Sequence, residues 1–113
     1  MAVEDDKLFL SHILDAADAI QEYLSGLTRE GFFELRMVQD AVVRQLEIIG
    51  EATRHLSKEF RSAHPAIPWS EIAGMRDKLV HDYFGVDLEI VWETASTDVP
   101  ALREKLLAIL GKG

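Results

Sequence analysis

Apolar residues recur every three or four positions along most of this chain, and this spacing constrains the fold more than any other feature. Within residues 6–25 it selects Leu10, Ile13, Leu14, Ala17, Ile20 and Leu24. Within residues 35–60 it selects Leu35, Val38, Val42, Leu46, Ile49, Thr53, Leu56 and Phe60. Such spacing puts the selected residues on one face of an α-helix. We therefore expect two long amphipathic helices.

The residues that begin and end helices divide the rest of the chain. Gly26 predicts the end of the first helix, and Thr28 predicts the start of the next element. The His64-Pro65 and Ile67-Pro68 pairs end the second pattern, because proline disfavours helical geometry in the residue before it. Further helices are expected at about 70–83, after Asp87 and from Asp98-Pro100 onward. The pattern predicts an all-α fold, a compact up-and-down bundle of about five helices, in one domain over residues 1–113.

Three residues should mark close packing inside this bundle. Gly50 lies within the second helix, where glycine costs about 1 kcal/mol relative to alanine. Its presence there predicts that another helix packs tightly against it. Trp69 and Trp92 lie beside helix ends, and we expect them to anchor the core.

Charge and composition limit the kinds of ligand and compartment. The 113 residues carry a formal net charge of -8 and include no cysteine, so disulfides and thiolate metal sites are excluded. Bulk attraction to nucleic acid is unfavourable at this charge, so an RNA would have to be held by a few placed cations. The apolar runs are too short to cross a membrane, and the N-terminus is acidic where a signal peptide would be basic. These features predict a cytoplasmic protein.

One segment, residues 74–85, concentrates chemically active side chains. The planar guanidinium of Arg76 could hold a phosphate, and His81 could move a proton to or from a ribose 2′-hydroxyl. Asp77, four positions before His81, could orient the imidazole, and Tyr83 could bond a phosphate oxygen. This set suits phosphate-ester cleavage without a metal. An arginine and a histidine near a helix end are also commonly a capping or ion-pairing set, so the spacing alone leaves both readings open.

The relative directions of Arg76 and His81 bear on assembly. Each helical residue turns about 100°, so two residues five positions apart diverge by about 140°. Either the helix loosens near His81, or a second copy of the chain completes the site. We favour a homodimer with this segment at its interface, because twofold symmetry is the commonest form of oligomer.

At this point the sequence resembles a known family. The pattern Arg76-Asp77-x-x-x-His81-x-Tyr83 resembles the Arg-x4-His-x-Tyr motif of HEPN domains of the HepT type. The runs 40–52, 68–69 and 87–92 are also similar to that family, so the resemblance covers nearly the whole chain. It implies a dimeric helical bundle that acts as a metal-independent endoribonuclease without a cofactor. Arg76 and His81 would be its catalytic pair, with Asp77 in support.

The resemblance also implies a partner. Proteins of this type are toxins encoded with a minimal nucleotidyltransferase, MntA, which serves as antitoxin and attaches AMP to the motif tyrosine, here Tyr83. The added negative charge and bulk would block RNA from the anion site. The homodimer and its antitoxin could form a higher oligomer. Whether the target is messenger or transfer RNA stays open.

Several charged and aromatic residues fall outside the motif. Lys78, Arg54 and Arg61 are candidate RNA contacts, since Arg54 and Arg61 share a face of the expected second helix. Glu47 and Glu51 could pair with neighbouring basic residues. The remaining histidines have no spacing typical of zinc ligands, and we expect them to have surface or capping roles: His12, His55 and His64.

Two other functions fit the same residues. The chain could be the non-catalytic helical half of a split nucleotidyltransferase, which binds a nucleotide or the partner that performs the chemistry. It could also be a purely structural interaction bundle. A nuclease needs His81 for turnover, whereas a nucleotide-binding module would bind without cleaving and would depend more on Arg76.

Overall fold

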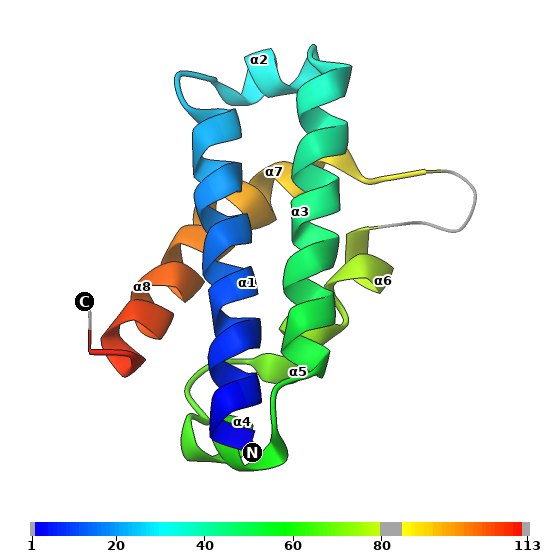
Figure 1. The fold of residues 1–113 in the computed structure, drawn as a ribbon. Coiled ribbons are helices and arrows are strands. Elements are labelled where there is room, and N and C mark those ends of the chain that lie inside the picture. The colour runs from blue at the N-terminus through cyan, green and yellow to red at the C-terminus, as the bar shows by residue number, and fades with distance from the viewer. Residues whose placement is uncertain (1, 80–84, 112–113) are drawn as a thin grey trace.

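Two long antiparallel helices organise the protein. The computed structural model describes residues 2–79 and 85–111. Helices α1 (Ala2–Leu24) and α3 (Arg36–Arg54) lie side by side and run in opposite directions (Figure 1). The short helix α2 (Arg29–Phe33) joins them at one end. Gly26, with φ at 77°, ends the first helical segment, and the Thr28 hydroxyl accepts the N–H of Gly31 at 3.0 Å, as the sequence predicted.

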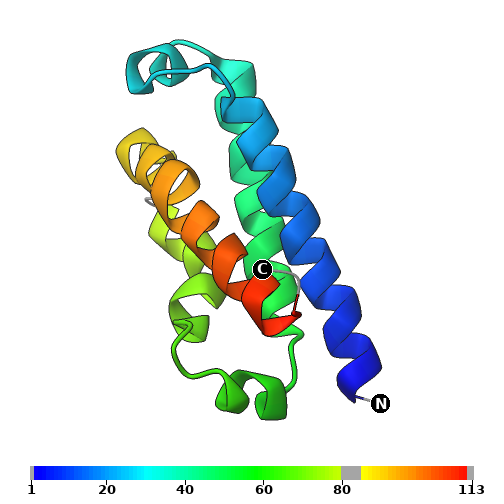
Figure 2. The ribbon, with the colours of Figure 1, turned by 90° about the vertical axis from the view of Figure 1, so that its left-hand side faces the viewer.

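Shorter helices complete the fold. They are α4 (Lys58–Ala63), α5 (Trp69–Ala73), α6 (Met75–Leu79), α7 (Leu88–Glu93), the π-helical turn η2 (Thr94–Asp98) and α8 (Val99–Ile109). Figure 2 shows α5, α6 and the continuous α7–η2–α8 segment on the same side of α1 and α3. Every element that the structure describes is helical, which confirms the predicted all-α class. Within the described ranges, no helix is both long and apolar enough to span a membrane.

The prediction of one helix over residues 35–60 is wrong for its C-terminal part. Helix α3 stops at Arg54, and Ser57 caps a separate helix α4 by accepting the N–H of Phe60 at 3.0 Å. A buried carboxylate from α1 fixes this break. Asp6 accepts the backbone N–H of Ser57 at 2.8 Å and its hydroxyl at 2.7 Å. Periodicity within one helix cannot reveal a contact between residues this far apart in the sequence.

Two further boundaries also differ from the prediction. The helix expected at 70–83 is interrupted at Gly74, whose N–H closes α5 on the Ser70 carbonyl at 3.0 Å before α6 begins. The helix expected to start at Asp98 instead continues from α7. In the π turn the Val99 N–H donates to the Thr94 carbonyl, so the backbone stays helical up to Pro100, which has no N–H to donate.

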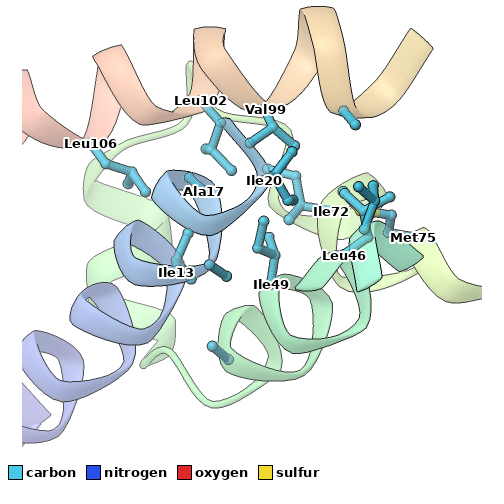
Figure 3. Packing of buried hydrophobic residues seen from close by; sticks show 14 of the residues in the cluster. Ile13, Ala17, Ile20, Leu46, Ile49, Ile72, Met75, Val99, Leu102 and Leu106 are labelled. Carbon is cyan, nitrogen blue, oxygen red and sulfur yellow. The ribbon is translucent and has the colours of Figure 1, made fainter. Parts of the chain in front are cut away.

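The core follows the predicted apolar faces. Figure 3 shows side chains from α1, α3, α5, α6 and α8 meeting in one cluster, among them Ile13, Ile20, Leu46, Ile49, Ile72, Met75, Leu102 and Leu106. Leu35 was expected in this cluster but is 42% exposed, because it is the N-cap of α3 and precedes the helical turn. Phe32, which periodicity did not select, is fully buried and lies 5.4 Å from the Trp92 ring.

Gly50 and Trp69 pack as predicted. A Cβ atom on Gly50 would lie 3.2 Å from the carbonyl oxygen of Ile72 and 3.5 Å from that of Ala73, so α5 approaches α3 closely there. Trp69 is buried, and its Nε1 donates to the carbonyls of Arg61 at 3.1 Å and His64 at 2.9 Å. The indole therefore fixes the end of α4 against α5.

Candidate functional site

A surface groove runs along the polar side of α3. It has a volume of about 520 Å³ and lies between the N-terminal half of α1 and helix α6. Because the apolar face of α3 is buried in the core, its charged residues remain on the outside and line the groove. We call it the α3 groove and define it by Phe9, His12, Arg44, Glu47, Glu51, Arg54, His55 and Arg76.

The motif arginine lies on one wall of the α3 groove. The Nε of Arg76 donates to Oε2 of Glu47 at 3.1 Å, which ties α6 to α3. The Arg76 side chain is 64% exposed and that of Glu47 is 30% exposed. A guanidinium has five N–H donors, and Glu47 takes the one on Nε. Among the described residues, the outer fork of Arg76 has no other partner and could receive a phosphate.

An aromatic cluster lies at the other end of the α3 groove. The imidazole of His55 stacks on the ring of Phe9, with centroids 4.8 Å apart and planes 16° from parallel. His12 meets the same phenyl ring edge-on at 5.8 Å. Oε2 of Glu51 lies 3.6 Å from Nε2 of His55, and its Oε1 lies 3.6 Å from Nη1 of Arg54. These contacts join α1 to the C-terminal end of α3.

The groove is cationic in an acidic protein. It is lined by the arginines Arg44, Arg54 and Arg76 and by only two carboxylates. With neutral histidines this leaves one net positive charge, whereas the chain as a whole carries -8. Arg44 is exposed and forms no ion pair with any described residue. The groove thus gathers cations on a chain that is acidic as a whole, which is what local attraction of a polyanion requires.

The other predicted RNA contacts do not all gather here. Arg54 joins Arg76 in the groove, but Arg61 lies on α4, so the shared helical face predicted for Arg54 and Arg61 is wrong. Lys78 borders a different cavity of about 230 Å³, together with Lys105 of α8. Asp77 is exposed on α6 next to Arg76.

Two motif residues, His81 and Tyr83, lie outside the described residues. The chain on either side of them is held together, because the Asp87 N–H donates to the carbonyl of buried Leu79 at 2.9 Å. Asp87 also caps α7 by accepting the N–H of Glu89 at 3.0 Å, as predicted. In the part of the chain that the structure describes, no group of three histidine or acidic side chains could hold a metal ion.

The aromatic cluster was not predicted from the sequence. His12 and His55 were expected to have unrelated surface roles, and Phe9 was not singled out. The three residues belong to two helices that the chain brings together only on folding. The relative register of α1 and α3, which the sequence does not give, would have been needed to find them.

Comparison with known proteins assigns the sequence to a family. The model of the family described as "Ribonuclease HepT-like" matches residues 13–109. The chain belongs to this family. The predicted resemblance to HepT proteins is therefore confirmed, and the family's description agrees with the predicted enzyme class, a ribonuclease. The matched range contains the whole Arg-x4-His-x-Tyr motif and all of helix α3.

Individual relatives of the HepT-like family agree with this assignment. A protein of Methanocaldococcus jannaschii named "Gamma-glutamylcyclotransferase and putative RNase" is 47% identical over 107 residues, which cover 95% of this chain and 48% of the relative. The chain thus spans about half the length of that relative. A protein of Caldanaerobacter subterraneus subsp. tengcongensis named "Putative RNase" is 47% identical over 104 residues, covering 92% and 93%.

A third relative carries the family name itself. The "Probable ribonuclease HepT" of Thermococcus cleftensis is 44% identical over 99 residues, covering 88% of this chain and 90% of that protein. No solved structure matches with significance. The shared features therefore come from sequence, and the α3 groove is described from this structure alone.

Proposed function

We propose that this HepT-like protein is a metal-independent endoribonuclease in which Arg76 and His81 act on the scissile phosphate. One observation carries the proposal. The motif arginine stands on the wall of a cationic groove in an otherwise acidic chain, held at Nε by Glu47 with its outer fork open to a ligand. A guanidinium with its outer fork free can bind a phosphate through two parallel N–H···O bonds.

The reaction needs one proton acceptor and one proton donor. His81 takes the proton from a ribose 2′-hydroxyl, and the 2′-oxygen attacks the adjacent phosphorus. The bond to the 5′-oxygen of the next nucleotide breaks, and that oxygen receives the proton from the protonated imidazole of His81. The products end in a 2′,3′-cyclic phosphate and a 5′-hydroxyl. Arg76 stabilises the negative charge that builds up on the phosphate oxygens, and Asp77 orients the imidazole.

A homodimer would complete this site. Arg76 and His81 diverge by about 140° on a regular helix, so two copies facing each other could bring the arginine of one to the histidine of the other.

The test is cleavage of a cellular RNA pool in EDTA. Wild type should cleave it and leave 2′,3′-cyclic phosphate ends. Arg76→Ala should reduce the rate by about 10²–10³-fold, as for loss of a donor to a developing oxyanion, and His81→Ala by about 10²–10⁴-fold. His64→Ala, at the C-cap of α4 and outside the groove, is the matched control and should cleave as wild type does. No cleavage by the unmodified wild type would contradict the proposal and favour the nucleotide-binding module.

We also propose that Tyr83 is the point of control, within a toxin–antitoxin pair. A nucleotidyltransferase partner of the MntA type would transfer AMP from ATP: the tyrosine oxygen attacks the α-phosphate, loses its proton and releases pyrophosphate. Incubation with such an enzyme and ATP should add one AMP to the wild type and none to Tyr83→Phe, as read by mass spectrometry. The modified protein should lose RNA cleavage. Cleavage that persists after complete modification would rule out this form of control.

A further inference from the structure

The cluster at the far end of the α3 groove has no role in the chemistry described above. We propose that His55, stacked on Phe9, is a platform for a nucleobase, and that Arg44 and Arg54 hold the phosphates of the same strand. The α3 groove would thus contain a subsite for single-stranded RNA beside the cleaved phosphate. The inference rests on the proposed function for the identity of the ligand, but binding at this subsite can be measured without cleavage.

The geometry of His55 suits stacking. Phe9 covers one face of the imidazole, with the rings 4.8 Å apart and nearly parallel, while the His55 side chain remains 55% exposed. The exposed surface therefore lies on the other face and the edges. Phe9 is partly buried against the core, and His12 supports its edge at 5.8 Å. The platform is held in place before any ligand arrives, and base–aromatic stacking accepts any base because each has a π face.

The distance between the arginines of the groove favours an oligonucleotide as the ligand. Arg44 and Arg54 are ten residues apart on α3, which at about 1.5 Å per residue separates them by about 15 Å. Arg76 joins the groove between them through Glu47. One phosphate group cannot reach cations spread over this length, whereas successive phosphates of an oligonucleotide can. A mononucleotide would occupy only part of the α3 groove.

The carboxylates of the groove do not prevent this binding. Glu51 lies 3.6 Å from both Arg54 and His55, and all three side chains are at least half exposed. Ion pairs this exposed contribute little, so Arg54 can exchange Glu51 for a phosphate. Glu47 is instead engaged with Arg76. Arg44, which has no ion pair among the described residues, is available without any exchange.

The test uses a 2′-O-methyl RNA oligonucleotide, which can bind but offers no 2′-hydroxyl for cleavage. Its Kd is measured by fluorescence anisotropy for wild type, His55→Ala, His55→Tyr and the control His64→Ala. His64 also contacts a phenylalanine ring but lies at the end of α4. Loss of one stacked base should raise the Kd of His55→Ala about tenfold or more. His55→Tyr keeps an aromatic face and should bind within about threefold of wild type, and His64→Ala should bind as wild type does.

Salt dependence separates the two parts of the subsite. Arg54→Gln should weaken binding and lower the slope of log Kd against log salt by about 0.7, the value for one phosphate contact on a single strand. His55→Ala should weaken binding and leave this slope unchanged. Circular dichroism of each variant checks that the helices are intact.

Several outcomes would overturn the inference. They are no binding of the oligonucleotide by wild type, an unchanged Kd for His55→Ala, or equal affinity for AMP and for the oligonucleotide, which would make the ligand a single nucleotide. The proposed function fails separately. If wild type cleaves no RNA yet the variants shift the Kd as expected, the subsite stands and the nuclease does not. If wild type cleaves RNA but His55→Ala does not change the Kd, the nuclease stands and the subsite does not.

Discussion

The two faces of helix α3 differ in burial and in chemistry. One face carries Val42, Leu46 and Ile49, which are fully buried against α1 and the shorter helices. The other face carries Arg44, Glu47 and Glu51, which line a groove together with residues from α1 and α6. The buried face stabilises the fold through contacts between apolar side chains only. The groove face places charged and aromatic side chains from different helices opposite one another.

This difference explains why the buried face can be predicted from the sequence, whereas the groove face can be recognised only in the folded structure. An apolar stripe needs only its own spacing to be recognised, because any apolar neighbour can cover it. A polar site depends on which particular residue comes to lie opposite. Glu47 contacts Arg76 of α6, and His55 stacks on Phe9 of α1. The role of each residue therefore depends on a partner from another helix.

The largest expected effect lies on the buried face. Leu46→Ala should lower the free energy of unfolding by about 2–5 kcal/mol, because it removes a fully buried side chain and leaves a cavity. Arg44→Gln, two residues earlier and on the groove face, should change it by less than about 0.5 kcal/mol. Urea unfolding followed by circular dichroism measures both. Similar losses for the two variants would contradict the division of α3 into a structural and a binding face.

A smaller effect is expected where a carboxylate breaks the helical pattern. Asp6→Ala should cost about 1–3 kcal/mol, because the N–H and hydroxyl of Ser57 lose their acceptor in a buried site. Ser57→Ala removes the hydroxyl and with it the cap of α4. The double variant should lose less stability than the two single losses added together, since both remove the same contact. Additive losses would mean that the hydroxyl bond from Ser57 to Asp6 contributes little and that Asp6 acts through the backbone N–H.

The fold was predictable from the sequence to the extent that local spacing determines it. The all-α class, the buried faces of α1 and α3, the Thr28 and Asp87 caps and the close packing at Gly50 all follow from residues near one another in the chain. The break after Arg54 could not be predicted, because Asp6 fixes it from α1. The continuous α7–η2–α8 segment was missed because Asp98 and Pro100 resemble the start of a new helix.

The candidate site was predictable only in part. Arg76 of the motif lies beside a groove that also contains Arg54, although the reason given for pairing Arg54 with Arg61 was wrong. The predicted ion pairs of Glu47 and Glu51 are present, with Arg76 and Arg54. Phe9, His12 and His55 could not be found from spacing, because their proximity arises from the packing of α1 on α3. The roles of His81 and Tyr83 stay predictions.

Gly50 tests the boundary between the two faces, since it is buried against α5 and also borders the α3 groove. Gly50→Ala gains helix propensity of about 1 kcal/mol. However, the new Cβ would meet the backbone oxygen of Ile72 at 3.2 Å, and overpacking of this kind costs about 1–3 kcal/mol. We expect the free energy of unfolding to fall by about 1 kcal/mol, as measured by thermal unfolding. A gain in stability would mean that α5 can move away from α3 freely.

A small change in stability is expected for Glu47→Gln. The pair with Arg76 is partly exposed, so its loss should alter the free energy of unfolding by less than about 1 kcal/mol. The amide oxygen of glutamine can still accept the Nε–H of Arg76, but without the charge that strengthens the bond. Arg76 should then be less well oriented, and RNA cleavage should fall by about tenfold or less. Asp40→Asn is the matched control, because it neutralises another carboxylate of α3 that pairs with an arginine, Arg36, at 3.7 Å outside the groove. An equal loss of cleavage in both variants would show that the net charge of α3 matters and that the position of Arg76 does not.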